Sequence, residues 1–290
     1  MQISCVASSG ALLGEGPLWD AARGVIWWVD IDSAALHAHH VASGVNRVQS
    51  LQCRLTALAL CEDDSLLACG DRGFVRLHVS AGLRVRIDEV LAAPAERAGN
   101  RFNDGKVDSA GRFWAGTMDG QGSGPHGSLY RLDAQRGATA VRSNLWVPNG
   151  PCFLADGTML AADTYQGRIT AVTLDAAGDS VAEREFARFG GAQGYPDGMT
   201  VDAHDHVWVA FWDGWCLRRL SPAGEVVAEI ALPVQRPTCP TFGGPALESL
   251  YVTTARTGLS PEALSRQPHA GGLLRLDPGV QGLAPARFRG

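Results

Sequence analysis

Three short stretches of the sequence each place an oxygen-bearing side chain directly before a glycine. They read LGEGPL at 13–18, VPNGPC at 147–152 and YPDGMT at 195–200, and the side chains are Glu15, Asn149 and Asp197. Carboxylate and amide oxygens are ligands that calcium, magnesium and manganese prefer in proteins. A fold that brings these stretches together would form a site for one divalent cation, with water or substrate completing its shell.

The three stretches open copies of a longer repeat. A single Asp-Gly or Asn-Gly is a common turn dipeptide and carries little information. Here the glycines recur in phase: 45 residues separate Gly105 from Gly150, 48 separate Gly150 from Gly198, and 89, two periods, separate Gly16 from Gly105. Each copy continues with three apolar or aromatic runs divided by turns. Six copies fill the chain, and after their opening motifs they begin at Pro17, Leu58, Lys106, Pro151, Met199 and Pro240.

The repeat predicts the fold. Runs of β-branched and aromatic residues separated by Asp-Gly or Ala-Gly turns indicate hairpins, and the chain has no sustained helical period. A period of about 45 residues with about four strands is typical of a propeller blade. We therefore expect residues 1–290 to form a single all-β domain, a six-bladed β-propeller. The first strand of each blade would line a central channel, so Glu15, Asn149 and Asp197 would point toward one axis.

Composition narrows the classes of partner. Hydrophobic residues make up 46% of the chain, which is ample for a core, whereas charged residues make up 19% and the net charge is −5. This balance argues against a nucleic-acid surface or an anionic membrane as partner and favours a small ligand. The start MQISCVASSG lacks a basic segment followed by an apolar run, and no stretch approaches the roughly 20 apolar residues of a membrane span. We expect a cytoplasmic protein, and the sequence leaves its oligomeric state open, a monomer included.

Cysteines and histidines do not indicate a metal site. The seven cysteines form no CxxC pair, which predicts free, buried or half-buried thiols. His204 and His206, in AHDHV, align with hairpin turns of other copies, and HAHH at 37–40 is assigned to a solvated turn at the outer end of the first copy. Most tryptophans are expected to pack between blades. The chain has no GxSxG elbow and no phosphate-binding glycine loop, which argues against serine-hydrolase chemistry and nucleotide binding.

The sequence resembles the gluconolactonase, regucalcin and SMP-30 family of sugar-lactone hydrolases almost end to end. The resemblance rests on LGEGPLWD (13–20), NRFNDGKVDSAGRFWAGTM (100–118), PNGPCFLADGTMLAADT (148–164), YPDGMTVD (195–202) and PTFGGPALESLYVTTA (240–255). TTARTGLS (253–260) and AGGLLRLD (270–277) are most similar to the bacterial sugar-acid lactonases within that family.

The resemblance implies a six-bladed propeller that holds one divalent metal ion through Glu15, Asn149 and Asp197. The metal is left open among calcium, zinc, manganese, magnesium and iron. The resemblance also implies that Arg101 and Asn103, in RFND, bind the substrate. Relatives of the regucalcin type carry a further acidic substrate contact after GTM, where this chain has DGQG, so either Asp119 or Gln121 takes that role or neither does.

The predicted activity is hydrolysis of a sugar lactone, an aldonolactone, to its aldonic acid. The metal would polarise the lactone carbonyl, and Asp197 would take the proton of the attacking water. Two alternatives remain: a calcium-binding scaffold propeller without turnover, and a metal-dependent esterase or phosphotriesterase. Arg101 and Asn103 beside the metal site favour the enzyme, because a scaffold would not need them.

Overall fold

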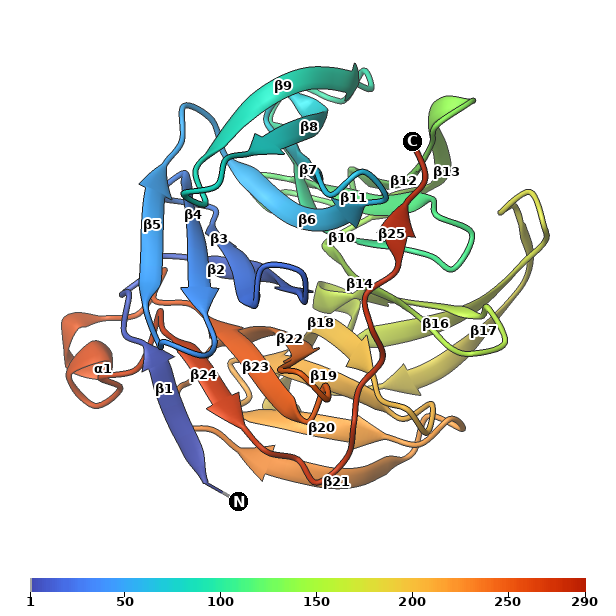
Figure 1. Ribbon diagram of the computed structural model, residues 1–290. Helices are drawn as coiled ribbons and strands as arrows, with labels where there is room; N and C mark the ends of the chain where they lie inside the picture. Colours follow the sequence, from blue (N-terminus) through green and yellow to red (C-terminus); the bar gives the residue numbers. More distant parts are fainter. Residues whose placement is uncertain (1) are drawn as a thin grey trace. The chain divides into compact units, whose positions relative to one another are not determined.

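The computed structural model describes residues 2–290, and β-strands dominate it (Figure 1). The strands form six sheets, each built on four antiparallel strands, and one of them gains a short fifth strand that runs parallel to its neighbour. These sheets are the blades of an all-β six-bladed β-propeller, which confirms the fold predicted from the repeat. Contacts between residues divide the six sheets into two compact units, each with three sheets.

The first unit contains the chain up to Arg54 and Phe189–Ala284. One of its sheets has the order β2 (Gly14–Asp20), β3 (Val25–Asp30), β4 (Ala35–His40), β5 (Asn46–Ser50). Another has the order β18 (Tyr195–Val201), β19 (Val207–Trp212), β20 (Cys216–Leu220), β21 (Val226–Ala231). The third has the order β22 (Pro237–Gly243), β23 (Ser249–Thr254), β24 (Leu273–Leu276), β1 (Ile3–Ala7).

The second unit contains Leu55–Arg188 and Pro285–Gly290. Its first sheet has the order β6 (Leu55–Cys61), β7 (Leu66–Gly70), β8 (Gly73–Val79), β9 (Val85–Ala92), with the short β25 (Arg287–Phe288) parallel to β6. Its second has the order β10 (Asn100–Val107), β11 (Phe113–Asp119), β12 (Gly127–Asp133), β13 (Gly137–Leu145). Its third has the order β14 (Pro148–Phe153), β15 (Met159–Asp163), β16 (Arg168–Leu174), β17 (Ser180–Arg188).

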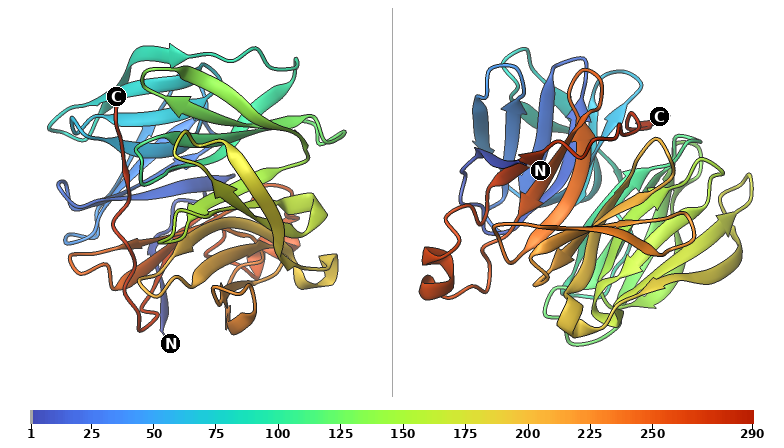
Figure 2. Two further views of the ribbon diagram at one scale, coloured as in Figure 1. Left: turned by 90° about the vertical axis from the view of Figure 1, so that its right-hand side faces the viewer. Right: turned by 90° about the horizontal axis from the view of Figure 1, so that it is seen from below.

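Helical structure is confined to connections. Two single-turn 3-10 segments, η1 (Thr164–Gln166) and η2 (Gly191–Gln193), accompany one short helix, α1 (Pro261–Ser265). The right-hand view of Figure 2 shows α1 as an orange-red coil that projects from the strands before and after it. Within residues 2–290 no helix has the length and apolar character needed to cross a membrane.

The first strand of every blade is irregular at the position of the repeated motif. The pairing with the second strand shifts register there in all six sheets, after Glu15, Leu55, Phe102, Asn149, Pro196 and Pro237. Such a bulge bends the strand and redirects a side chain. Glycine is required at this bend in two of the blades. Gly150 has a φ of 90°, a backbone conformation that favours glycine. A Cβ on Gly198 would lie only 2.4 Å from the sulfur of Cys239.

A second repeated feature joins the first two strands of three blades. An aspartate at or directly after the end of the first strand accepts the indole N–H of a fully buried tryptophan on the second strand. The three pairs are Asp20 with Trp27 at 3.1 Å, Asp108 with Trp114 at 2.8 Å and Asp202 with Trp208 at 3.0 Å. Five of the eight tryptophans, these three together with Trp19 and Trp28, are buried, so most tryptophans pack the blades as predicted.

The histidine predictions had mixed outcomes. His204 and His206 lie in a turn whose backbone N–H groups donate to Asp202, as expected. The assignment of HAHH to a solvated turn is wrong, because residues 37–40 belong to β4. His37 is buried and stacks on Trp28 with ring centroids 3.7 Å apart, and its burial lowers its pKa to about 4. The seven cysteines are free, and each is buried or half-buried, as predicted.

Candidate functional site

The motif position carries a buried polar side chain in each of the six blades. At the residue that corresponds to Glu15, Asn149 and Asp197, the remaining blades have Thr56, Asp104 and Thr238. All six side chains are less than a tenth exposed, although each belongs to a polar residue type. Buried carboxylates require a pairing group or a cation. The repeat therefore places three carboxylates, one amide and two hydroxyls at equivalent positions of the six blades.

Glu15 and Asp197 both belong to the first unit. Glu15 lies on β2 opposite Val29, and its Oε2 accepts the backbone N–H of Gly16 at 3.0 Å. Asp197 lies on β18 in the irregular segment between Pro196 and Met199. The exposed fractions of the two residues are 6% and 4%. This combination of buried charge and hard oxygen donors fits a divalent cation.

Asn149 belongs to the second unit, where hydrogen bonds fix its amide. The Nδ2 group of Asn149 donates to Oγ1 of Thr164 at 2.9 Å, and its Oδ1 accepts from Nδ2 of Asn103 at 2.9 Å. Asn103 also donates to the carbonyl of Pro148 at 3.1 Å. A carbonyl oxygen has two lone pairs, so Oδ1 of Asn149 keeps one for a cation while it accepts from Asn103. The amide orientation thus fits the ligand role expected from the sequence.

Arg101 joins this network from the start of β10. One guanidinium nitrogen, Nη1, donates to Oδ1 of Asn103 at 2.9 Å and to the carbonyl of Phe102 at 2.8 Å. The structure therefore links Arg101, Asn103 and Asn149 in one chain of hydrogen bonds. Both residues assigned to substrate binding are connected to a residue assigned to the metal.

Asp104 is a buried acid that the sequence analysis did not assign to the site. Its Oδ1 accepts the N–H of Gly105 at 2.7 Å, and its Oδ2 accepts the N–H of Gly150 at 3.1 Å, so it joins β10 to β14. Burial raises the pKa of Asp104 to about 6, although Lys106 and both backbone N–H groups favour its charged form. Asp104 precedes Gly105 in phase with the other three motifs, and this signal could have identified it. Thr164, which accepts from Asn149, lies outside the repeated motif, so the repeat gave no signal for it.

Asp119 is occupied by its own loop. Its Oδ1 accepts the N–H of Gln121 at 2.9 Å, and its Oδ2 accepts the N–H of Ser123 at 3.2 Å together with the Ser123 hydroxyl. These hydrogen bonds, the Ser123 hydroxyl first, lower the pKa of Asp119. A carboxylate offers about four acceptor positions, so one remains for a substrate hydroxyl. Gln121 is exposed in the same loop.

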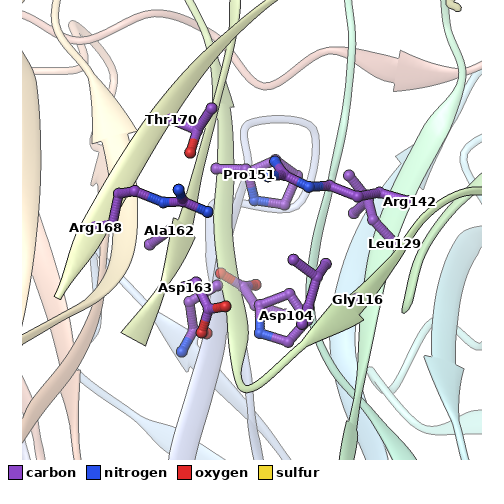
Figure 3. Close-up of a pocket in the computed structure, with 13 residues that line it drawn as sticks. Asp104, Gly116, Leu129, Arg142, Pro151, Ala162, Asp163, Arg168 and Thr170 are labelled. Atoms are coloured by element: carbon purple, nitrogen blue, oxygen red, sulfur yellow. The ribbon is translucent and has the colours of Figure 1, made fainter. Parts of the chain in front are cut away.

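A small pocket lies between the sheets β10–β13 and β14–β17, beside Asn149 and Asp104. Figure 3 shows Arg142 and Arg168 extending into it from opposite sides, with Asp104 and Asp163 at its other end. Its volume of about 20 Å³ is room for about one water molecule. The pocket is therefore too small for a sugar ring.

Comparison with known proteins agrees with the motifs. The model of the SMP-30/gluconolactonase/LRE-like region matches residues 13–256. The chain belongs to this family. A 6-deoxy-6-sulfogluconolactonase from Pseudomonas putida is 34% identical to it, and the alignment covers 99% of each chain. A pentonolactonase from Haloferax volcanii is also 34% identical, with 97% of this chain and 96% of that protein covered.

The solved structures give the same result. A calcium-binding regucalcin from Agrobacterium tumefaciens aligns with a TM-score of 0.92 and 32% identity, covering 98% of this chain and 96% of that one. The family resemblance stated from the sequence is thus confirmed over nearly the whole chain.

Proposed function

We propose that this protein is a divalent-metal-dependent lactonase that hydrolyses a sugar lactone to the corresponding aldonic acid. The family membership supports the reaction class, since relatives that match over nearly their full length are named as sugar lactonases. The observation that carries the proposal is the chain of hydrogen bonds from Arg101 through Asn103 to Asn149. A scaffold would have no use for a cationic donor built onto a metal-ligand amide.

We assign the metal to Glu15, Asn149 and Asp197. Two carboxylates and one amide carry a total charge of −2, which neutralises a dication and suits an uncharged substrate. When bound, a divalent cation supplies Lewis-acid polarisation of the lactone carbonyl and stabilises negative charge on its oxygen. A structural relative named as a calcium-binding regucalcin supports a divalent cation in this fold.

The remaining steps belong to side chains of this chain. Arg101 and Asn103 donate hydrogen bonds to ring or hydroxyl oxygens of the sugar and orient its carbonyl. Asp197 accepts the proton of the attacking water as general base. The oxygen of that water forms the new bond to the carbonyl carbon, and the ring C–O bond then breaks. The ring oxygen takes up a proton as it leaves, which yields a hydroxy acid. Asp119 is assigned to a substrate hydroxyl through its remaining acceptor position.

One experiment tests substrate, metal and enzyme status together. The protein is stripped of metal with a chelator and assayed on five- and six-membered aldonolactones, an aryl ester and a phosphotriester, with each divalent cation restored in turn. We expect lactone hydrolysis that depends on the added cation and exceeds hydrolysis of the ester and phosphotriester. Hydrolysis unaffected by chelation would exclude the metal role, and turnover of the phosphotriester alone would replace the substrate class.

A further inference from the structure

Tyr165 is an exposed aromatic side chain next to the candidate site. Its exposed fraction is 54%, and among the Phe, Tyr and Trp residues of positions 2–290 only Tyr165 and Trp215 are exposed. Several other exposed apolar residues, namely Val48 on β5, Val90 on β9, Val181 on β17 and Val226 on β21, lie on outer strands. Burying an aromatic ring is favourable, and an exposed ring does not gain this free energy in the free protein. An exposed ring on a connecting loop is therefore a candidate for ligand contact.

The backbone of Tyr165 is tied to the proposed metal ligand. Tyr165 is the middle residue of η1, and the preceding Thr164 accepts the amide N–H of Asn149. The backbone N–H of Thr164 donates to the carbonyl of Val147 at 3.0 Å. The loop that carries Tyr165 is therefore fixed to the strand that presents Asn149.

The ring of Tyr165 is positioned from one side by Trp146. Their centroids lie 6.2 Å apart with the planes at 62°, an edge-to-face arrangement. The backbone N–H of Trp146 donates to Oδ2 of Asp163 at 3.2 Å. Asp163 is buried and immediately precedes η1. It therefore connects the backbone of Trp146 to the start of the segment that carries Tyr165.

The loop that Asp119 organises lies beside the ring. A Cβ built on Gly122 would lie 3.8 Å from Cε2 of Tyr165, which is ordinary van der Waals distance. This loop is anchored where Gly120 donates to the carbonyl of Gly99 at 3.0 Å, two residues before Arg101. Tyr165 thus lies between the loop of the proposed substrate contacts and the strand of Asn149.

We propose that Tyr165 is a specificity-determining residue that contacts the sugar of the lactone. The inference rests on the proposed lactonase function. One face of a sugar ring presents C–H groups, whose slight positive charge favours the negative face of an aromatic ring. Tyr165 receives this face of the substrate, while Arg101, Asn103 and Asp119 bind its oxygens. The absence of a side chain at Gly122 leaves space beside the ring.

The test compares Tyr165→Phe, Tyr165→Leu and Tyr165→Ala with wild type and with Val181→Ala, an exposed residue on the outer strand of the same sheet. Steady-state kinetics use the aldonolactone that wild type hydrolyses fastest. We expect Tyr165→Ala and Tyr165→Leu to raise KM roughly tenfold with little change in kcat or metal affinity, the scale of one lost aromatic contact. Tyr165→Phe and Val181→Ala should remain close to wild type.

Three results would overturn the inference. These are wild-type KM in Tyr165→Ala, a Phe variant as impaired as the Ala variant, and a loss of metal affinity that matches the loss of activity. The last result would mean that Tyr165 acts only by supporting Thr164 and Asn149.

A binding measurement separates this inference from the proposed function. Saturation-transfer NMR with 1,5-anhydroglucitol, a cyclic polyol that keeps the six-membered ring and has no lactone bond to hydrolyse, should show transfer to ring C–H protons in wild type and a weaker transfer in Tyr165→Ala. If wild type hydrolyses no lactone but shows this pattern, the lactonase proposal fails and the sugar contact stands. If lactones are hydrolysed and the transfer is equal in both proteins, the contact is refuted and the lactonase proposal stands.

Discussion

Asn103 donates a hydrogen bond from Nδ2 to Oδ1 of Asn149 at 2.9 Å, although 46 positions separate them in the chain. The first residue lies on β10 and the second on β14, the first strands of consecutive blades. The bond connects a residue assigned to the substrate with one assigned to the metal. A change at either end is therefore expected to affect the other, and the following predictions use this connection.

Thr164 should control the affinity for the metal. In Thr164→Val the side chain keeps its volume but loses the oxygen that accepts the Asn149 N–H. Groups that orient metal ligands typically contribute about 10- to 100-fold to affinity, so calcium or manganese binding should weaken by that factor. Calorimetric titration of each cation measures it. Thr173→Val, at an exposed position of β16, is the control, and equal affinities for both variants would contradict the assigned orientation.

Arg101 should matter for the substrate and much less for the metal. Arg101→Ala removes the donor to Asn103 and should lower kcat/KM for the lactone by roughly ten- to a thousandfold, the loss of one to three charge-assisted hydrogen bonds. Arg101→Lys should recover only part of this loss, because an ammonium lacks the planar fork. Steady-state kinetics and metal titration are compared with Arg86→Ala, an exposed control. Unchanged kinetics would remove Arg101 from the site.

Asp197 is assigned two roles that conservative substitution can separate. Asp197→Asn keeps a ligating oxygen but loses the charge and the basic oxygen, so metal binding should weaken without disappearing. At saturating metal the variant should still lose at least about a hundredfold in kcat, because general-base catalysis typically contributes 10²- to 10⁴-fold.

Glu15→Gln makes the same change of charge at the ligand that is not assigned as base. Excess metal should restore most of its activity, and the kcat of both variants is measured over a range of metal concentrations. Equal recovery in both would show that Asp197 is a ligand only and that another group takes the proton.

His37 should make the fold sensitive to acid. Burial lowers its pKa from 6.5 to about 4, so below pH 6.5 the unfolded chain binds a proton that the folded chain does not. The stability from neutral His37 is present above pH 6.5 and is lost as the pH falls toward 4. Between pH 7 and pH 5 this amounts to about 2 kcal/mol of unfolding free energy.

The variant His37→Phe keeps an aromatic ring against Trp28 but cannot titrate. Urea denaturation at both pH values should show a decrease in stability that is about 2 kcal/mol smaller than in wild type. Equal decreases in the two proteins would show that His37 does not cause the acid sensitivity.

The blades follow from the sequence because each is a local unit. Successive strands joined by short turns pair with their neighbours, so a period of about 45 residues with alternating apolar runs is sufficient to predict them. The sequence did not indicate that β1 joins β24, or that β25 pairs with β6, since these contacts link distant parts of the chain. HAHH was misassigned for a related reason: its histidines are polar by type, and only packing against Trp28 and its surroundings buries them.

The candidate site divides in the same way. The identities of Glu15, Asn149 and Asp197 and their shared position follow from the repeat, because equivalent residues of a repeat occupy equivalent places in each blade. The tertiary structure decided which groups surround them. Asn149 meets Asn103 and Thr164, Asp104 is buried against Gly150, and Asp119 turns its oxygens into its own loop. These outcomes depend on how neighbouring blades pack and on loop geometry at the level of single hydrogen bonds, which no local pattern of residue types encodes.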